Sequence, residues 1–144
     1  MDFAQRGMTL IELMVVVAIV AILLAVAIPM YMNQGMESHR TDAKTALLDL
    51  ATREERYYSV NSVYTNDPTQ LYGAGSAFPL QVGSGTPDYQ ISVVTPAGTV
   101  PATGSTFSLS AVPINNQISD TCGTYLLDNT GNQSNSGNST TNCW

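Results

Sequence analysis

The strongest constraint on the fold is one apolar stretch near the N-terminus. Every residue from Leu13 to Ile28 is apolar, and the stretch from Met8 onward carries only one charge. At about 1.5 Å of rise per residue, a helix over this stretch is roughly 31 Å long, which matches the hydrocarbon core of a bilayer. A helix that is apolar on all sides has no place on the surface of a small soluble domain. The stretch therefore predicts a membrane-spanning helix over residues 8–30.

The single charge in this stretch is Glu12. A carboxylate near the start of a membrane-spanning helix costs several kcal/mol, of the order of 3, unless it finds a partner. The most economical partner is a cation supplied by another copy of the same helix. Glu12 therefore indicates that the helix associates with other copies of the same helix.

Two plainer interpretations of the N-terminus remain open. One is a secretory signal peptide, with Ala25-Val26-Ala27 as its cleavage site. Against it, Glu12 would lie within the apolar core, and the helical pattern continues beyond Pro29. The other is a plain single-span anchor, which leaves Glu12 without a role.

Residues Gly7 to Met14, GMTLIELM, followed by the apolar run and Pro29, resemble the class III prepilin signature of type IV pilins and pseudopilins. The resemblance is to type IVa-like pilins, minor pilins included. It implies that residues 1–7 are a leader, that a prepilin peptidase cuts between Gly7 and Met8, and that the new Met8 amine is methylated. Cleavage would place this amine four residues before Glu12, so that Glu12 of one subunit can pair with Met8 of its neighbour.

In a filament of such subunits, the apolar halves of the helices would bury one another. Pro29 lies within this segment and lacks a backbone N–H, so we expect it to kink or locally unwind the helix there. Glu12 and Pro29 are thus the residues that we expect to govern assembly.

The rest of the chain, residues 31–144, predicts a head of class α+β. Ala43, Leu47 and Leu50 recur at helical spacing, which extends the helix to about residue 58 with an amphipathic second half. Charged residues from Glu37 to Arg56 are expected on its exposed face, and His39 is expected in solvent. Residues 59–87 are rich in Gly, Pro and Asn and predict a loop. Strand-like runs at 89–94, 106–112 and 122–128 predict a small antiparallel sheet packed on the helix, within residues 88–128.

Cys122 and Cys143 are the only cysteines. In a small exported domain such a pair predicts a disulfide, worth about 3 kcal/mol by chain entropy, with two free thiols as the alternative. The tail beyond Asn129 is poor in apolar residues, and the bridge would fix it to the third strand. This region, 122–143, resembles the C-terminal disulfide region of type IVa pilins. The fold prediction therefore ends in a disulfide-closed loop.

The charge distribution constrains the ligands of the head. All five Lys and Arg residues lie in the first 56 positions, whereas Tyr57–Trp144 carries four Asp and no cation. A surface that binds duplex DNA needs Lys or Arg to replace the phosphate counterions. Direct nucleic-acid binding is therefore not expected.

Enzymatic chemistry finds little support in the sequence. There is one His, no G-x-S-x-G motif and no Gly-rich phosphate loop, so no catalytic residue, cofactor or metal is expected. The resemblance instead implies a structural subunit, major or minor, of a type IV pilus used for adhesion, twitching motility or DNA uptake. A DNA-uptake receptor pilin and a type II secretion pseudopilin are the alternatives.

The same resemblance implies where the chain is found and what it meets. The subunit would wait in the bacterial inner membrane and then join a cell-surface pilus. Its partners would be other copies or other pilins, the prepilin peptidase and the pilus assembly machinery.

Overall fold

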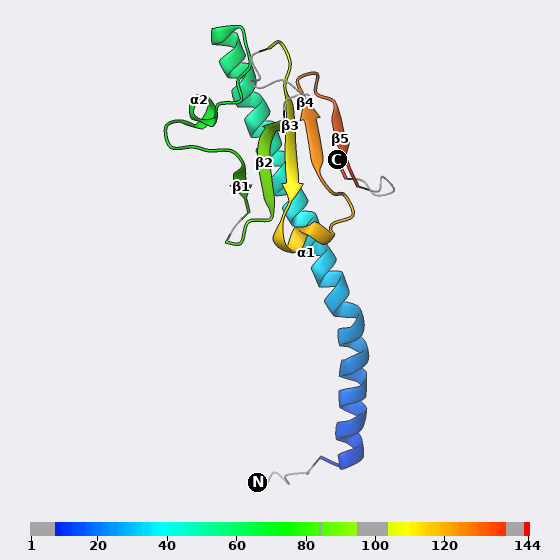
Figure 1. Cartoon of the computed structure of the whole chain (residues 1–144). Coiled ribbons are helices and arrows are strands. Elements are labelled where there is room, and N and C mark those ends of the chain that lie inside the picture. The colour runs from blue at the N-terminus through cyan, green and yellow to red at the C-terminus, as the bar shows by residue number, and fades with distance from the viewer. Residues whose placement is uncertain (1–7, 84, 95–103, 138–142) are drawn as a thin grey trace, which may run out of the picture. The chain divides into compact units, whose positions relative to one another are not determined.

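The computed structural model describes residues 8–83, 85–94, 104–137 and 143–144 (Figure 1). The chain divides into two compact units, one up to Gly35 and the other from Met36 to Trp144. We call residues 8–35 the stem and Met36–Trp144 the head, and each is described by itself. Helix α1, Leu10–Asn61, contributes to both units.

The stem is helical from Leu10 onward because Thr9 caps its first turn. The Thr9 hydroxyl oxygen accepts a hydrogen bond from the backbone N–H of Glu12 at 3.3 Å. Pro29 lies inside α1, which is not unwound there in the single chain, so a kink or a local unwinding within the filament stays a prediction. Proline removes one backbone donor from the helix, and the residues on both sides keep their helical conformation.

In the head, α1 continues to Asn61, three residues beyond the predicted end. Short polar side chains extend it, because the Asn61 amide donates to the Tyr57 carbonyl oxygen at 3.0 Å. The helix stops where Ser62 takes a left-handed conformation at φ 58° and donates its N–H to the carbonyl oxygen of Tyr58 at 2.7 Å.

The prediction of a loop over residues 59–87 was wrong in part. The segment also contains helix α2, Pro68–Tyr72, and strand β1, Leu80–Val82. The Asp67 carboxylate accepts the backbone N–H of Thr69 at 2.9 Å, and Pro68 occupies the first helical position, where a missing donor costs nothing. The Asp67-Pro68 pair, which lies in the predicted loop, also fits a helix start.

The head contains one five-stranded antiparallel sheet in the order β1-β2-β3-β4-β5. The later strands and the 3₁₀ helix η1 are β2 Tyr89–Val94, β3 Ser108–Pro113, η1 Asn115–Ser119, β4 Tyr125–Asp128 and β5 Gln133–Asn135. The prediction for β2 matches the structure, and β3 is displaced by one or two residues.

Strand β4 begins three residues later than predicted, because Gly123 is part of a turn. Its φ is 62°, and its N–H donates to the carbonyl oxygen of Asp120 at 3.2 Å. A Cβ at this position would lie 2.8 Å from the hydroxyl oxygen of Ser136, so the site requires glycine.

Strand β5 comes from the polar tail, which had been predicted only as a disulfide-fixed loop. The Asp128 carboxylate accepts the backbone N–H groups of Thr130 and Asn132, and Gly131 has a φ of 78°. This tight turn reverses the chain and pairs Gln133 with Leu127. Main-chain pairing, rather than apolar content, therefore makes this strand.

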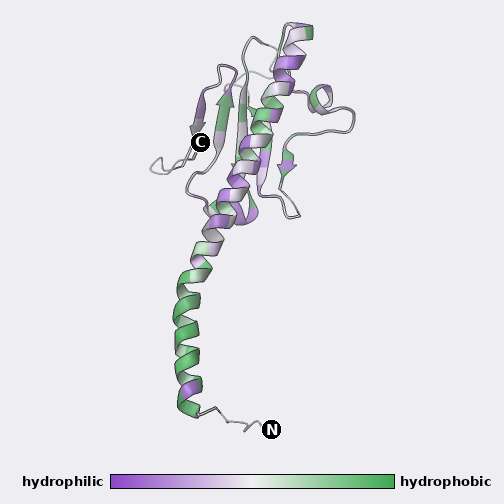
Figure 2. Ribbon diagram, turned by 180° about the vertical axis from the view of Figure 1, so that it is seen from behind, coloured by the Kyte–Doolittle hydropathy of each residue, from purple (hydrophilic) through white to green (hydrophobic). Residues whose placement is uncertain are grey.

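Helix α1 covers one face of the sheet, as both views of the head show (Figures 1 and 2). The core between helix and sheet contains the predicted helix positions Ala43, Leu47 and Leu50, all completely buried. The sheet contributes alternate residues of three strands, with Phe107 next to them: Tyr89, Ile91, Leu109, Ala111, Tyr125 and Leu127. The α+β prediction of a long helix packed on an antiparallel sheet is thus confirmed.

Candidate functional site

The stem exposes apolar side chains along its described length, which Figure 2 shows as a nearly unbroken hydrophobic run. By length and composition, α1 contains a segment that could cross a membrane, and that segment is not buried within this chain. Exposed apolar surface of this extent marks a membrane or protein contact. The stem therefore suits a membrane-anchored precursor.

The predicted processing and assembly residues gather at the stem. Met8 lies just before α1 and is 61% exposed, Glu12 is exposed in the first helical turn, and Pro29 is inside the helix. Gly7 lies outside the described residues, so the cleavage between Gly7 and Met8 stays a prediction. The pairing of Glu12 with a second copy likewise stays a prediction.

Thr9, which the sequence-based prediction did not include, is the residue that caps α1 in this segment. Thr9 and Glu12 have the T-x-x-E spacing of a capping box, in which the first residue caps the helix and the fourth lies in its first turn. This pattern was available in the sequence. The capping fixes where the helix begins relative to Met8, and therefore where Glu12 lies.

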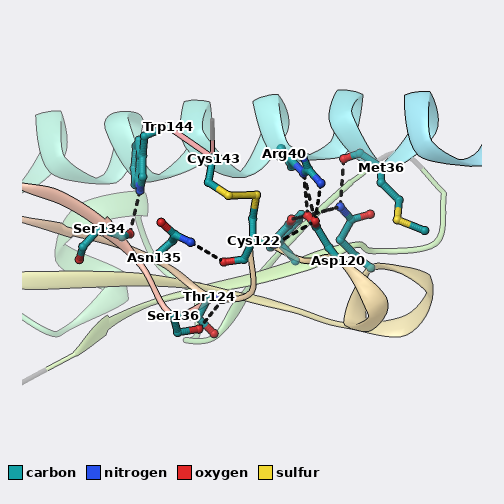
Figure 3. The surroundings of a disulfide bond; sticks show 12 residues. Met36, Arg40, Asp120, Cys122, Thr124, Ser134, Asn135, Ser136, Cys143 and Trp144 are labelled. Atoms are coloured by element: carbon teal, nitrogen blue, oxygen red, sulfur yellow. Dashed lines mark hydrogen bonds and ion pairs between the residues drawn. A yellow bond between two sulfur atoms is a disulfide. The ribbon is translucent and has the colours of Figure 1, made fainter. Parts of the chain in front are cut away.

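The C-terminal disulfide is confirmed. Cys122 and Cys143 are bonded, with their Cα atoms 5.6 Å apart (Figure 3). Besides the pairing of β4 with β5, side chains also hold the tail. The Trp144 indole donates to the Ser134 carbonyl oxygen at 2.7 Å, and the Asn135 amide donates to the Cys122 carbonyl oxygen at 3.0 Å.

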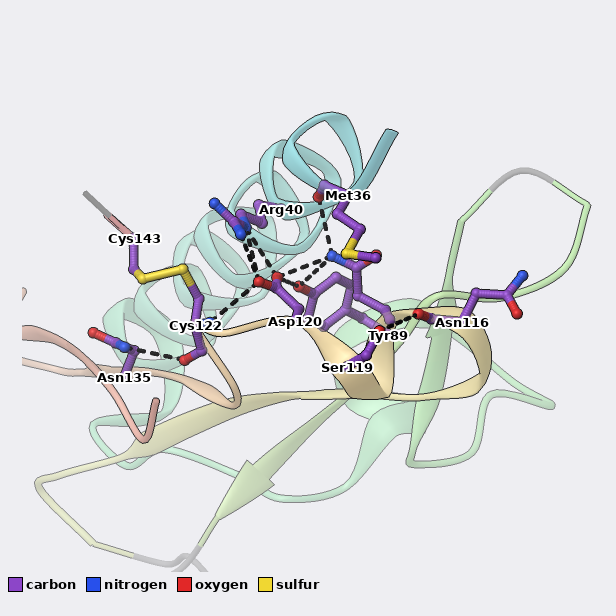
Figure 4. Close-up of polar contacts among 10 residues, drawn as sticks. Met36, Arg40, Tyr89, Asn116, Ser119, Asp120, Cys122, Asn135 and Cys143 are labelled. Atoms are coloured by element: carbon purple, nitrogen blue, oxygen red, sulfur yellow. Dashed lines mark hydrogen bonds and ion pairs between the residues drawn. A yellow bond between two sulfur atoms is a disulfide. The ribbon is translucent and has the colours of Figure 1, made fainter. Parts of the chain in front are cut away.

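A buried ion pair connects α1 to the turn before β4 (Figure 4). The Arg40 guanidinium donates to both carboxylate oxygens of Asp120 at 2.6–3.1 Å. Asp120 also accepts from the Tyr89 hydroxyl, the Gln117 amide and the Cys122 N–H. Burial by itself would raise the pKa of Asp120, but the hydrogen bonds from Arg40 and Cys122 outweigh it and hold the pKa below its ordinary value.

The expectation that the charges from Glu37 to Arg56 form an exposed face was therefore wrong for several residues. The Arg40 side chain is only 18% exposed, and Glu54 is completely buried. His39, expected in solvent, has its Nδ1 atom 3.0 Å from the Asp88 carboxylate and is 38% exposed. Helical periodicity alone could not show that Asp88, Asp120 and the backbone of Thr65, all outside α1, lie against these side chains.

Glu54 is the least expected of these residues. One of its oxygens accepts the backbone N–H of Thr65 at 3.1 Å, and the other is buried without a hydrogen-bond partner among the described residues. Burial raises the pKa of Glu54 to about 7, against the opposing effect of the Thr65 hydrogen bond. The head thus carries a carboxyl group that changes charge near neutral pH.

The described residues of the head form shallow recesses beside α1, among them the following two. One, of about 360 Å³, is lined by Arg53, Arg56, Val60 and Gln70, among others. The other, of about 380 Å³, lies near Asp42 and Asp49 and reaches Val82. Within the described ranges, no three His, Cys, Asp or Glu side chains come together in a way that could hold a metal ion.

Arg53 forms one wall of the first recess and is held in place by its neighbours. Its guanidinium donates to the Asp49 carboxylate at 2.8 Å and to the Leu71 carbonyl oxygen at 3.0 Å. It also lies 4.2 Å from the centre of the Tyr72 ring. The positive charge of Arg53 is therefore paired with the Asp49 carboxylate within the head.

These features define a class of protein: an apolar helical stem that begins with a capped, acidic first turn, joined to a helix-on-sheet head with a disulfide near its C-terminus. A family model described as type IV minor pilin ComP, DNA uptake sequence receptor, matches residues 29–126. A second model, the prokaryotic N-terminal methylation motif, matches residues 2–28. The chain belongs to the type IV pilin family.

Individual relatives are pilins as well. The chain is 40% identical to the type IV major pilin protein PilA of Myxococcus xanthus over 67 residues, which is 46% of this chain and 30% of that protein. It is 35% identical to the type IV major pilin protein PilE of Neisseria gonorrhoeae over 77 residues, which is 54% of this chain and 46% of that protein. The chain thus spans less than half the length of these two curated relatives.

Among solved structures, the chain is similar to a type IV pilin from Shewanella oneidensis. The sequence identity is 34%, the TM-score is 0.49, and the match covers 76% of this chain and 97% of the other.

Proposed function

We propose that this chain is a structural, non-catalytic subunit of a type IV pilus. The observation that carries the proposal is the stem, whose exposed apolar side chains are interrupted near their start by the single carboxylate of Glu12. In lipid this charge needs a partner, and in a bundle of identical helices the freed amine of a neighbouring Met8 supplies one. Family membership supports this function, since the proteins that it resembles are pilins.

Processing precedes assembly in this proposal. Cleavage between Gly7 and Met8 releases the amine, which is methylated, and the subunit waits in the inner membrane with its head outside the cytoplasm. The assembly machinery then moves it into a surface filament. The match of residues 2–28 to the N-terminal methylation motif supports this order.

The pairing is tested by replacing Glu12 with Gln, which removes the charge and keeps the size. The variant should accumulate in the membrane to the wild-type level while filament yield falls by about tenfold or more, because an unpaired amine in the bundle costs at least about 1.4 kcal/mol. Asp42→Asn, which neutralises an exposed acid of the head, is the matched control and should leave the filament yield unchanged. A wild-type filament yield from Glu12→Gln contradicts the pairing.

A second candidate function is DNA-uptake reception, and the family model over residues 29–126 is the observation that favours it. The negative net charge of the head argues against DNA-uptake reception. The head has nine Asp and Glu against four Lys and Arg, and Arg40 and Arg53 are paired with carboxylates. Titration of the detergent-solubilised chain with duplex DNA at two salt concentrations separates the functions. Salt-dependent micromolar binding would favour the receptor function, because phosphate contacts are lost as salt rises.

A further inference from the structure

Two opposite charges in the head have no partner among the residues that the structure describes. Among the described Asp and Glu residues of the head, only Glu37 has a side chain that makes no hydrogen bond, ion pair or ring contact. Among the described Lys and Arg residues of the head, the same is true only of Arg56. Both are exposed on α1. The other cations are engaged: Arg40 with Asp120, Arg53 with Asp49, and Lys44 at 5.7 Å from the Tyr125 ring centre.

Arg56 also lines the first of the two recesses described above. It lines the recess of about 360 Å³ together with Val60, Asn61 and Gln70, and the Val60 side chain is 79% exposed. Positive charge beside an exposed apolar side chain and two amides suits a carboxylate on a short aliphatic chain, which is the chemistry of a Glu side chain. The charge and the lining residues of this recess therefore favour an acidic protein segment as its occupant.

The charge balance identifies the source of that segment. The head has nine Asp and Glu against four Lys and Arg, so packed copies repel one another unless specific contacts offset the repulsion. We propose that the recess at Arg56 receives Glu37 of a second copy of this chain, and that this contact helps to hold heads together in the filament. The proposal rests on the proposed function.

The positions of both residues on one helix give the contact a definite geometry. They are 19 positions apart, which is about 28 Å along α1 and about 100° around its axis. Each copy thus offers its acid and its base at different heights and on different sides. If parallel copies are displaced along the filament by about 28 Å, Arg56 of one copy lies at the same height as Glu37 of the next copy. The contact would then repeat along the filament.

A charge swap tests the proposal in cells that export filaments of the full chain. Arg56→Glu and Glu37→Arg should each reduce filament yield about fivefold or more, because each replaces an attraction with a repulsion. The double variant should recover at least half of the wild-type yield. As the matched control, Arg56→Glu is combined with Asp42→Arg, which reverses another exposed acid of α1 five positions from Glu37 and should give no recovery.

A covalent readout tests the same contact without charge reversal. Glu37→Cys combined with Arg56→Cys should give a ladder of linked multimers when filaments are treated with a bifunctional thiol crosslinker long enough to span a Glu–Arg contact, and either single variant should not. If wild-type filaments form and the double swap fails to recover, or Asp42→Arg recovers as well, the Glu37–Arg56 contact is wrong while the pilus function stands. The contact is also wrong if the double-cysteine filaments stay monomeric. If the wild-type chain forms no filaments, the proposed function itself fails.

Discussion

Because Glu54 is buried, the free energy of unfolding of the head should fall as the pH rises through neutrality. Its side chain is completely buried, and burial raises its pKa from the ordinary 4.5 to about 7. A carboxyl with a raised pKa in the folded state binds its proton more tightly there than in the unfolded state. Its contribution is therefore fully present below about pH 4.5 and is lost as the pH rises through about 7.

The size of this effect follows from the two pKa values. Each unit of difference corresponds to about 1.36 kcal/mol, so ionised Glu54 should cost the folded head about 3 kcal/mol at pH 9 relative to pH 4. Replacement by Gln keeps the shape and removes the ionisation. The free energy of unfolding of Glu54→Gln, minus that of wild type, should therefore increase by about 3 kcal/mol between pH 4 and pH 9.

Urea unfolding of the full chain in detergent micelles measures this difference, with the fluorescence of Trp144 as the signal. Trp144 is the single tryptophan and packs edge-on against Tyr125 in the head, so it reports unfolding of the head and not of the stem. Any pH-independent cost of the extra amide cancels, because only the change with pH is read. Glu37→Gln is the control and should show a flat difference. A flat or decreasing difference for Glu54→Gln would refute the assignment of a buried, protonated carboxyl.

Two further predictions concern the contacts at the β4 end of the head. Replacing Cys122 and Cys143 together by Ser should lower the free energy of unfolding by about 3 kcal/mol, since the bridge closes a loop over a separation of 21 residues; an unchanged urea midpoint would contradict this. Arg40→Met should cost about 3–5 kcal/mol near pH 7, because it leaves the buried Asp120 carboxylate without its cation. The loss should shrink as the pH falls below 3.8, the ordinary pKa of Asp, because the lowered pKa of Asp120 makes its contribution disappear as the group takes up a proton. A loss that does not vary between pH 7 and pH 3 would show that the Asp120 charge is not what Arg40 balances.

The parts of the fold that follow from strong local patterns could be predicted from the sequence. The apolar run gave the stem, and the spacing of Ala43, Leu47 and Leu50 gave the buried face of α1 in the head. Strand β2 and the disulfide also followed, because alternation and a cysteine pair are signals within one segment.

What could not be predicted depends on partners far away in the sequence. Strand β5 has the sequence Gln-Ser-Asn and forms because β4 offers it a free edge. Asp120 looks like any surface acid until Arg40, eighty residues earlier, is placed against it. Glu54 fits an exposed helix position by composition, but it is buried and accepts a hydrogen bond from the backbone N–H of Thr65, eleven residues later.

The candidate site divides in the same way. The stem residues Met8, Glu12 and Pro29 could be identified because the prepilin pattern is contiguous. The recess at Arg56 could not, because Gln70 and Leu71 reach it from α2. The recess could be predicted only if α2, the short helix that begins after Asp67 at Pro68, had been predicted first.

The central claim, that the stem is retained and becomes the part through which subunits assemble, is tested most directly at the N-terminus of the mature protein. Mass spectrometry of filaments purified from the cell surface should give an N-terminal peptide that begins at methylated Met8 and still contains Glu12. A mature chain that begins at Ile28, after cleavage at Ala25-Val26-Ala27, would contradict the account, because the stem would then have been a discarded signal peptide.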